Sequence, residues 1–251
     1  QGYAFDSAIA ARVLDLPPEE TEERLETLER IYAFVKLTGE TELPDRTMTL
    51  RYRFVHVLYQ NALFSDLKPT RKARLSRDVG QALEAAHAKS TRKVAHELAA
   101  LFETGRDFSR AAKYYLMAAG QANAVFAHRE AATLAADGLE MVEKIDPSLE
   151  SSRTELELQL ALGLALRSFR GFGHPETGKA YSRARELCHE VGDAPQLFPV
   201  LFGLWEFFQN QGDLEAAVDV GEQMLVLAEK SDDQGQRVAA HAVMADNLVC
   251  V

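Results

Sequence analysis

The sequence predicts a mainly α-helical protein in two parts, a small mixed domain over residues 1–88 and a right-handed solenoid of paired helices over residues 89–251. The first observation is composition: alanine, leucine and glutamate are abundant, and only eight of the 251 residues are proline. Alanine and straight-chain residues lose little entropy in a helix. The second is that strand-like alternation occurs only between residues 32 and 54, and the third is unbroken helical periodicity from residue 91 onward.

Two helices are predicted first, over residues 4–14 and 17–31. The earlier one has Asp6 or Ser7 near its N-cap, where a short polar side chain can accept a backbone N–H. The later one begins with two prolines and has acidic residues in its first turn. Its apolar face consists of Leu25, Leu28 and Ile31.

The period then changes to that of two short strands, residues 32–37 and 48–54, joined by a polar loop rich in turn-forming residues. Two further helices follow, at about 54–67 and 70–88. Helices followed by two strands and a polar loop make a winged-helix arrangement, so residues 1–88 are predicted to form a winged-helix domain with a small β wing.

A winged helix invites a DNA-binding interpretation, and a DNA-binding transcription regulator is kept as an alternative. Residues 1–50 carry eleven acidic against five basic side chains, the second helix is strongly acidic, and the wing contains Glu40, Glu42 and Asp45. DNA phosphates would repel such surfaces. Together with a net charge of −10, this charge distribution favours a domain that faces protein rather than nucleic acid.

Charge reverses over residues 51–77, which carry seven basic side chains and one acid. Such asymmetry is typical of a specific face of a domain. One interpretation is a solvated helix face that balances the acidic second helix. The other is a docking surface for another domain or an acidic partner, with four candidate contact residues: Lys68, Arg71, Lys72 and Arg74.

Eight helices separated by loops of a few residues are predicted next, at about 91–104, 107–123, 127–144, 150–170, 174–191, 195–210, 213–230 and 234–251. Antiparallel pairs of this length stack into solenoids. The clearest repeat runs from Gln196 to Ser231, with a turn at Gly212 and a small residue, Ala217, that can let two helices approach closely. It resembles a tetratricopeptide repeat.

The solenoid offers candidate contacts for a protein or peptide partner. Phe169, Phe172 and His174 flank a glycine-rich break, and aromatic residues crowd the helix that contains Trp205. For the aromatic residues on the Trp205 helix, the simpler interpretation is a solenoid core with one exposed ring. If they line a groove for a peptide or a partner helix, its predicted rim consists of Arg167, Arg170, Gln209 and Asn210.

Three stretches together carry a resemblance to a known family: "YRFVHVLYQNALFSDLKPTRKARLSRDVGQALE", "HPETGKAYSRARELCHEVGDAPQLFPVLFGLWEFF" and "GDLEAAVDVGEQMLVLAE". They resemble the region downstream of the ATPase module in bacterial STAND-class signalling proteins, some of which are fused to class III adenylate or guanylate cyclase domains. The resemblance implies that this chain is the winged-helix and sensor-array piece of a longer protein whose ATPase core uses ATP or ADP with Mg.

The chain itself shows no catalytic or cofactor motif. It contains no G-x-x-x-x-G-K-[ST], no H-E-x-x-H and no G-x-S-x-G. We therefore expect neither an enzyme nor a bound cofactor or metal in this chain. No run of apolar residues is long enough for a membrane span, and no secretory signal is present, so a cytoplasmic location is expected.

His56 lies in "YRFVHVLYQNALF", after the second predicted strand. In STAND proteins a histidine at an apolar-His-Asp motif contacts the β-phosphate of ADP in the ATPase core and holds the closed form. The resemblance implies this role for His56, although Val57 stands where the motif has aspartate. The alternative is a structural histidine whose ring is satisfied by local backbone.

The function predicted from the sequence is therefore regulatory and non-catalytic. Binding of a protein or small effector on the solenoid would control a nucleotide switch in an intramolecular ATPase domain. Besides the DNA-binding regulator, the rival is a stand-alone tetratricopeptide scaffold, and a homo-oligomer is compatible with either.

Overall fold

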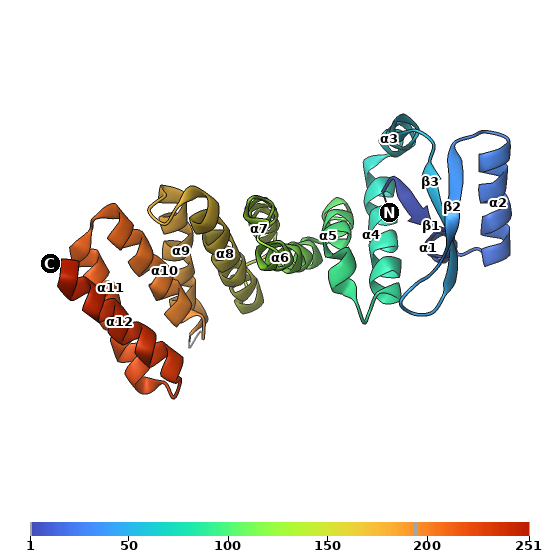
Figure 1. The fold of residues 1–251 in the computed structure, drawn as a ribbon. Helices are drawn as coiled ribbons and strands as arrows, with labels where there is room; N and C mark the ends of the chain where they lie inside the picture. Colours follow the sequence, from blue (N-terminus) through green and yellow to red (C-terminus); the bar gives the residue numbers. More distant parts are fainter. Residues whose placement is uncertain (1, 193–194, 251) are drawn as a thin grey trace. The chain divides into compact units, whose positions relative to one another are not determined.

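The computed structural model describes residues 2–192 and 195–250. The protein is mainly α-helical, with a small three-stranded antiparallel sheet near the N-terminus (Figure 1). Its contacts separate into two compact units that divide between Tyr114 and Tyr115, and each unit is described by itself. The predicted domain division after residue 88 falls inside the first unit. Helix α5 (Ala95–Thr104), which follows residue 88, packs on helix α4 (Pro69–Ala86), which precedes it.

The first unit contains the whole sheet and the helices around it. In chain order its elements are β1 (Ala4–Asp6), α1 (Ser7–Leu14), α2 (Pro18–Arg30), β2 (Val35–Glu42), β3 (Met48–Phe54), α3 (Val57–Ser65), α4 (Pro69–Ala86), a 3₁₀ turn (Thr91–Val94), α5 (Ala95–Thr104) and the beginning of α6 (Phe108–Ala124).

The sheet has the strand order β1-β3-β2, with both pairings antiparallel. Tyr52 lies at its centre, opposite Phe5 on one side and Leu37 on the other. A register shift between Leu37 and Gly39 leaves one extra residue in β2, and the Thr38 hydroxyl there donates a hydrogen bond of 2.8 Å to the carbonyl oxygen of Arg51. This bulge lets β2 continue along β3.

Two details of the predicted sheet were wrong. Residues 4–6 form strand β1 rather than the first turn of a helix, and β2 runs on to Glu42 through what was predicted as loop. Both differences have the same physical reason. A three-residue strand and a polar strand end are stabilised by pairing with β3, a tertiary interaction that a local pattern does not contain.

The second unit contains the remainder of α6 and six more helices, namely α7 (His128–Val142), α8 (Leu149–Arg170), α9 (Pro175–Val191), α10 (Leu197–Gln211), α11 (Leu214–Lys230) and α12 (Gln234–Cys250). From α7 onward each helix packs against the next one in the sequence. The helical segments predicted from residue 91 are confirmed with small shifts at their ends, and the predicted end at residue 251 lies outside the described residues.

Local chemistry sets several of the helix ends. Gly212 adopts φ 76° after α10, a left-handed conformation that glycine reaches without steric cost. Asp213 then caps α11 by accepting the backbone N–H of Ala216 at 3.1 Å. Before α8, Ser148 and Ser151 form a reciprocal capping box.

A continuous apolar core joins α8 to α12. Its most deeply buried large side chains include Leu187, Leu201, Leu204 and Met224. The Cys188 side chain also lies in this core as a free thiol. None of the described helices is long and apolar enough to cross a membrane.

Candidate functional site

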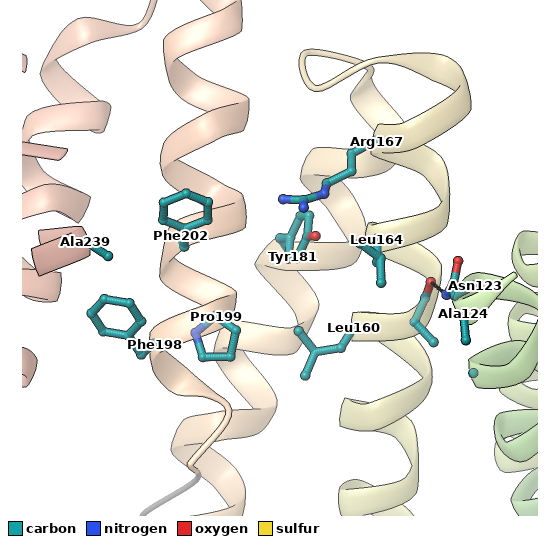
Figure 2. A pocket seen from close by; sticks show the side chains of 12 residues that line it. Asn123, Ala124, Leu160, Leu164, Arg167, Tyr181, Phe198, Pro199, Phe202 and Ala239 are labelled. Atoms are coloured by element: carbon teal, nitrogen blue, oxygen red, sulfur yellow. Dashed lines mark hydrogen bonds between the residues drawn. The ribbon is translucent and has the colours of Figure 1, made fainter. Parts of the chain in front are cut away.

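A pocket of about 790 Å³ lies in the second unit (Figure 2). It is lined by Gly120, Asn123, Ala124, Leu160, Ala161, Leu164, Arg167, Tyr181, Phe198, Pro199, Phe202 and Ala239. We call this pocket the groove. These residues come from α6, α8, α10 and α12, with Tyr181 of α9 as the one addition. Every second helix of the unit thus contributes to one surface.

The groove is apolar, and its polar lining groups are few. Leu160 and Leu164 come from α8, while Phe198 and Phe202 come from α10 (Figure 2). Among the described residues that line it, Arg167 carries the only charge. A concave apolar surface with few polar groups is the usual form of a ligand site.

The Arg167 guanidinium reaches over the Tyr181 ring (Figure 2). Its Nη1 donates to the Glu206 carboxylate in an ion pair between α8 and α10, and its guanidinium carbon lies 5.7 Å from the centre of the Phe172 ring. Burial raises the pKa of Glu206, an effect that Arg167 opposes. The pair therefore joins a charged donor at the groove to a carboxylate that is poorly solvated.

Tyr181 is buried beneath Arg167 and has little room to move. A Cβ atom built on Gly163 of α8 would lie 2.9 Å from its ring, and one built on Gly203 of α10 would lie 2.4 Å from it. Real Cβ contacts are not that short. The Tyr181 ring of α9 therefore fits between α8 and α10 because both facing positions are glycine. This close fit makes Tyr181 a fixed part of the groove wall.

Asn123, on α6, is committed to structure. Its Nδ2 donates to the carbonyl oxygen of Ala161 at 3.0 Å, and its Oδ1 lies 3.2 Å from Nδ1 of His128. The amide therefore joins α6 to α8, and both its nitrogen and its oxygen already have a partner within the protein. Arg167 remains the group with the most donors to offer an occupant.

The burial of Tyr181 predicts a pH-dependent stability. Burial raises the pKa of Tyr181 to about 12, whereas an unfolded tyrosine ionises near pH 10. The folded-state pKa is the higher one, so the contribution is fully present below pH 10 and is lost as the pH rises toward about 12. Between pH 9 and pH 11, wild type should lose roughly 1 kcal/mol relative to Tyr181→Phe.

Urea unfolding followed by Trp205 fluorescence at several pH values measures this difference, because Trp205 is the only tryptophan. Other tyrosines are common to both proteins, so their ionisation cancels in the comparison. A gap between the two proteins that is the same at pH 9 and pH 11 would show that the Tyr181 hydroxyl is not desolvated.

His56 is exposed at the N-cap of α3. Its Nδ1 accepts the backbone N–H of Leu58 at 3.1 Å, so the ring is oriented by local backbone, as the structural alternative expected. The contact orients an exposed ring at a helix N-terminus, a place that suits anions. A nucleotide contact for His56 stays a prediction.

Helix α3 has no buried residue among its nine. Its exposed apolar side chains and that of the residue preceding His56 form what we call the α3 surface: Val55, Val57, Leu58, Tyr59, Leu63 and Phe64. Contiguous apolar exposure of this kind marks interaction surfaces. The sequence showed an apolar stretch here, but not that it would face solvent.

The four basic candidates in the first unit have different surroundings. The Lys72 ammonium lies 3.8 Å from the centre of the Phe64 ring and so covers part of the α3 surface. Lys68, Arg71 and Arg74 are exposed beside it. Their role in partner binding stays a prediction.

The predicted partner contacts on the solenoid are not brought together as one site. Trp205 Nε1 and Gln209 Nε2 both donate to Oδ1 of Asn247, at 2.9 and 2.8 Å, and so hold α10 against α12. Arg170 forms an exposed ion pair of 2.6 Å with Glu176, and Asn210 Nδ2 donates at 2.8 Å to the carbonyl oxygen of Glu206.

Of the predicted rim residues, Arg167 lines the groove. The apolar lining residues Leu160, Leu164, Phe198 and Phe202 were missed. Their helical spacing was visible in the sequence, but spacing alone does not tell a groove-facing residue from a core residue.

Within the described parts of the chain, no group of three or more histidine, cysteine, aspartate or glutamate side chains could hold a metal ion. Comparison with known proteins finds no family model and no curated protein that matches this chain.

Proposed function

We propose that this chain is a non-catalytic regulatory part of a bacterial STAND-class signalling ATPase. In this proposal residues 1–88 are a winged-helix domain and residues 89–251 are a tetratricopeptide-like solenoid whose groove receives an effector. The observation that carries it is the groove itself, an apolar concavity built from every second helix with one charged side chain in its lining.

The solenoid assignment is supported by how consecutive helices meet. Each helix from α7 to α11 packs on the next, and alternate helices share the groove surface, as expected for stacked antiparallel pairs. Small residues lie at the close approaches, including Ala180 and Ala217, which are almost completely buried. Buried small side chains of this kind are what a tetratricopeptide-type pair would require, which supports the proposal.

The switch part of the proposal rests on the α3 surface. An ATPase core that docks there would bury apolar side chains that are now exposed, and it would place its nucleotide near the exposed His56 ring. The basic residues Lys68, Arg71 and Arg74 would contribute at the edge of the same interface.

Control of the switch requires that an effector bind the open and closed arrangements with different affinity. A typical coupling free energy is about 1–3 kcal/mol. In this proposal the groove supplies that difference because an occupant would contact α8 and α10 together and would so favour one arrangement of the solenoid over the other.

The test is ADP binding by the full-length protein, measured by calorimetry for wild type and His56→Ala. We expect about tenfold weaker ADP binding in the variant, since a charge-assisted hydrogen bond to phosphate is lost. His96→Ala, an exposed histidine on α5, is the matched control. Equal ADP affinity in all three proteins would remove the sensor role of His56, and a parent gene without a phosphate-binding loop would favour a stand-alone scaffold.

A further inference from the structure

We infer that the groove is a binding site for a small amphiphilic carboxylate, a molecule with an acyl chain and one carboxylate end. The carboxylate would be held by Arg167, and the chain would lie along the leucines of α8 and the phenylalanines of α10. This inference rests on the proposed function in one respect only, that the groove is the effector site.

Size and polarity favour a small amphiphile over an extended peptide. A volume of about 790 Å³ lies within the range of small-molecule sites. The walls are helices, whose backbone groups are used internally, and Asn123 is already bonded to Ala161 and His128. An extended peptide would leave its own backbone N–H and C=O groups without partners, whereas an acyl chain has none to satisfy.

The charge at Arg167 favours an anionic end. Its planar guanidinium has five N–H donors and matches a carboxylate in bidentate geometry. One Nη donates to Glu206, and the Arg167 side chain is 26% exposed, so an occupant can reach it. A cationic amphiphile would meet the same guanidinium unfavourably, and a neutral one would gain only from the apolar walls.

Glu206 gives the site an internal competitor. Its side chain is 18% exposed and is poorly solvated, so a second carboxylate at Arg167 would compete with it or share the guanidinium. Replacing Glu206 by glutamine keeps the shape and removes the competing charge. The geometry therefore predicts opposite effects for the two partners of one ion pair.

The test uses this chain with decanoate as the probe and decan-1-ol as its neutral counterpart, both below the concentrations at which they aggregate. Binding is followed by calorimetry and by Trp205 fluorescence, since the Trp205 ring lies 5.6 Å from that of Phe202 in the groove lining. We expect one decanoate per chain, bound at least tenfold more tightly than decan-1-ol.

Variants locate the two ends of the probe. Arg167→Gln should abolish the preference for decanoate, and Glu206→Gln should tighten decanoate binding severalfold while leaving decan-1-ol unchanged. Phe202→Ala should weaken both probes alike. Arg153→Gln is the matched control, because Arg153 is exposed on the same helix but does not line the groove.

Equal affinity for the two probes, or decanoate binding that survives in Arg167→Gln, would overturn the inference. Binding of several decanoate molecules per chain at weak sites would also overturn it. If decanoate fails while His56→Ala still weakens ADP binding in the full-length protein, the ligand class is wrong and the proposed switch stands. If decanoate binds as described but ADP affinity does not depend on His56, the site is real and its proposed output is wrong.

Discussion

Replacing Gly203 with alanine is expected to destabilise the second unit by about 2 kcal/mol. In an unobstructed helix the same substitution stabilises by up to about 1 kcal/mol, because glycine has the greater backbone freedom to lose. The sign reverses at this position because the new Cβ atom would lie 2.4 Å from the Tyr181 ring. The ring is nearly fully buried, so it cannot move into solvent.

The neighbouring helix prevents the ring from moving the other way. A Cβ atom on Gly163 would lie 2.9 Å from the same ring, so that side of the ring is also in close contact with backbone. The strain introduced at Gly203 must therefore separate α10 from α9 or force Tyr181 out of its rotamer. Either change also disturbs the Arg167–Glu206 pair above the ring.

A double-mutant cycle tests this directly. In a Tyr181→Leu background, which is itself destabilised, Gly203→Ala should become neutral or stabilising, giving a coupling free energy of about 2 kcal/mol. Gly120→Ala is the matched control, since a Cβ atom there meets nothing within 4 Å, and it should not destabilise. Urea unfolding followed by Trp205 fluorescence measures all of these, and additive effects of Gly203→Ala and Tyr181→Leu would refute the steric explanation.

The helices of the second unit were predictable because each one has its own periodic apolar face and its own end signals. The pair Gly212-Asp213 shows why: glycine takes the left-handed conformation and aspartate caps the next helix, and both properties belong to the residue itself. The strand β1 was not predictable in this way. Its three residues form a strand because Phe5 pairs with Tyr52, a residue 47 positions later.

The groove was only partly predictable. Arg167 was singled out as a polar residue near an aromatic break, but its partner Glu206 lies 39 positions away on another helix. Gln209 was predicted at the rim and Trp205 as a partner contact, yet both donate to Asn247. Which face of a helix lines a groove depends on the rotation of that helix against its neighbours, and single-helix periodicity does not contain that rotation.

At the α3 surface the sequence pattern suggested burial and the structure shows exposure. The segment has apolar side chains on every side of the helix and only three polar ones, Gln60, Asn61 and Ser65, a pattern more usual in a buried helix. In the structure it has no buried residue. Periodicity cannot distinguish a helix buried in its own domain from one that another protein or domain would cover. That distinction is the physical basis for proposing a docked partner at α3.

Replacing Phe102 with alanine is expected to destabilise the first unit by about 3–5 kcal/mol, the range for truncating a buried aromatic side chain. Phe102, on α5, is fully buried. Its ring is stacked on Tyr114 of α6, with 5.7 Å between centroids, and contacts α4 at Gly80, where a Cβ atom would lie 3.1 Å from it. Loss of the ring therefore leaves a cavity among three helices rather than at the surface.

The effect is also expected to spread to the polar groups around the ring. The Tyr114 hydroxyl donates at 2.5 Å to Glu84, and the Arg110 guanidinium lies 5.2 Å from the Phe102 ring centre while it also donates to Glu84. If Tyr114 shifts into the cavity, its hydrogen bond to Glu84 lengthens. The pKa of Tyr114, which burial and Glu84 raise well above the ordinary value, should then fall.

Hydrogen exchange of the α4 and α5 amides, measured as a function of urea, reports the loss of unfolding free energy in the first unit. Phe64→Ala is the matched control, because Phe64 is 40% exposed on α3 and the Lys72 ammonium lies over its ring. The control should cost no more than about 1 kcal/mol. A Phe102→Ala protein with the exchange protection of the control would mean that this ring does not hold α5 to α4, and the stability of the first unit would then have to come from its other contacts, such as those between α1 and α4.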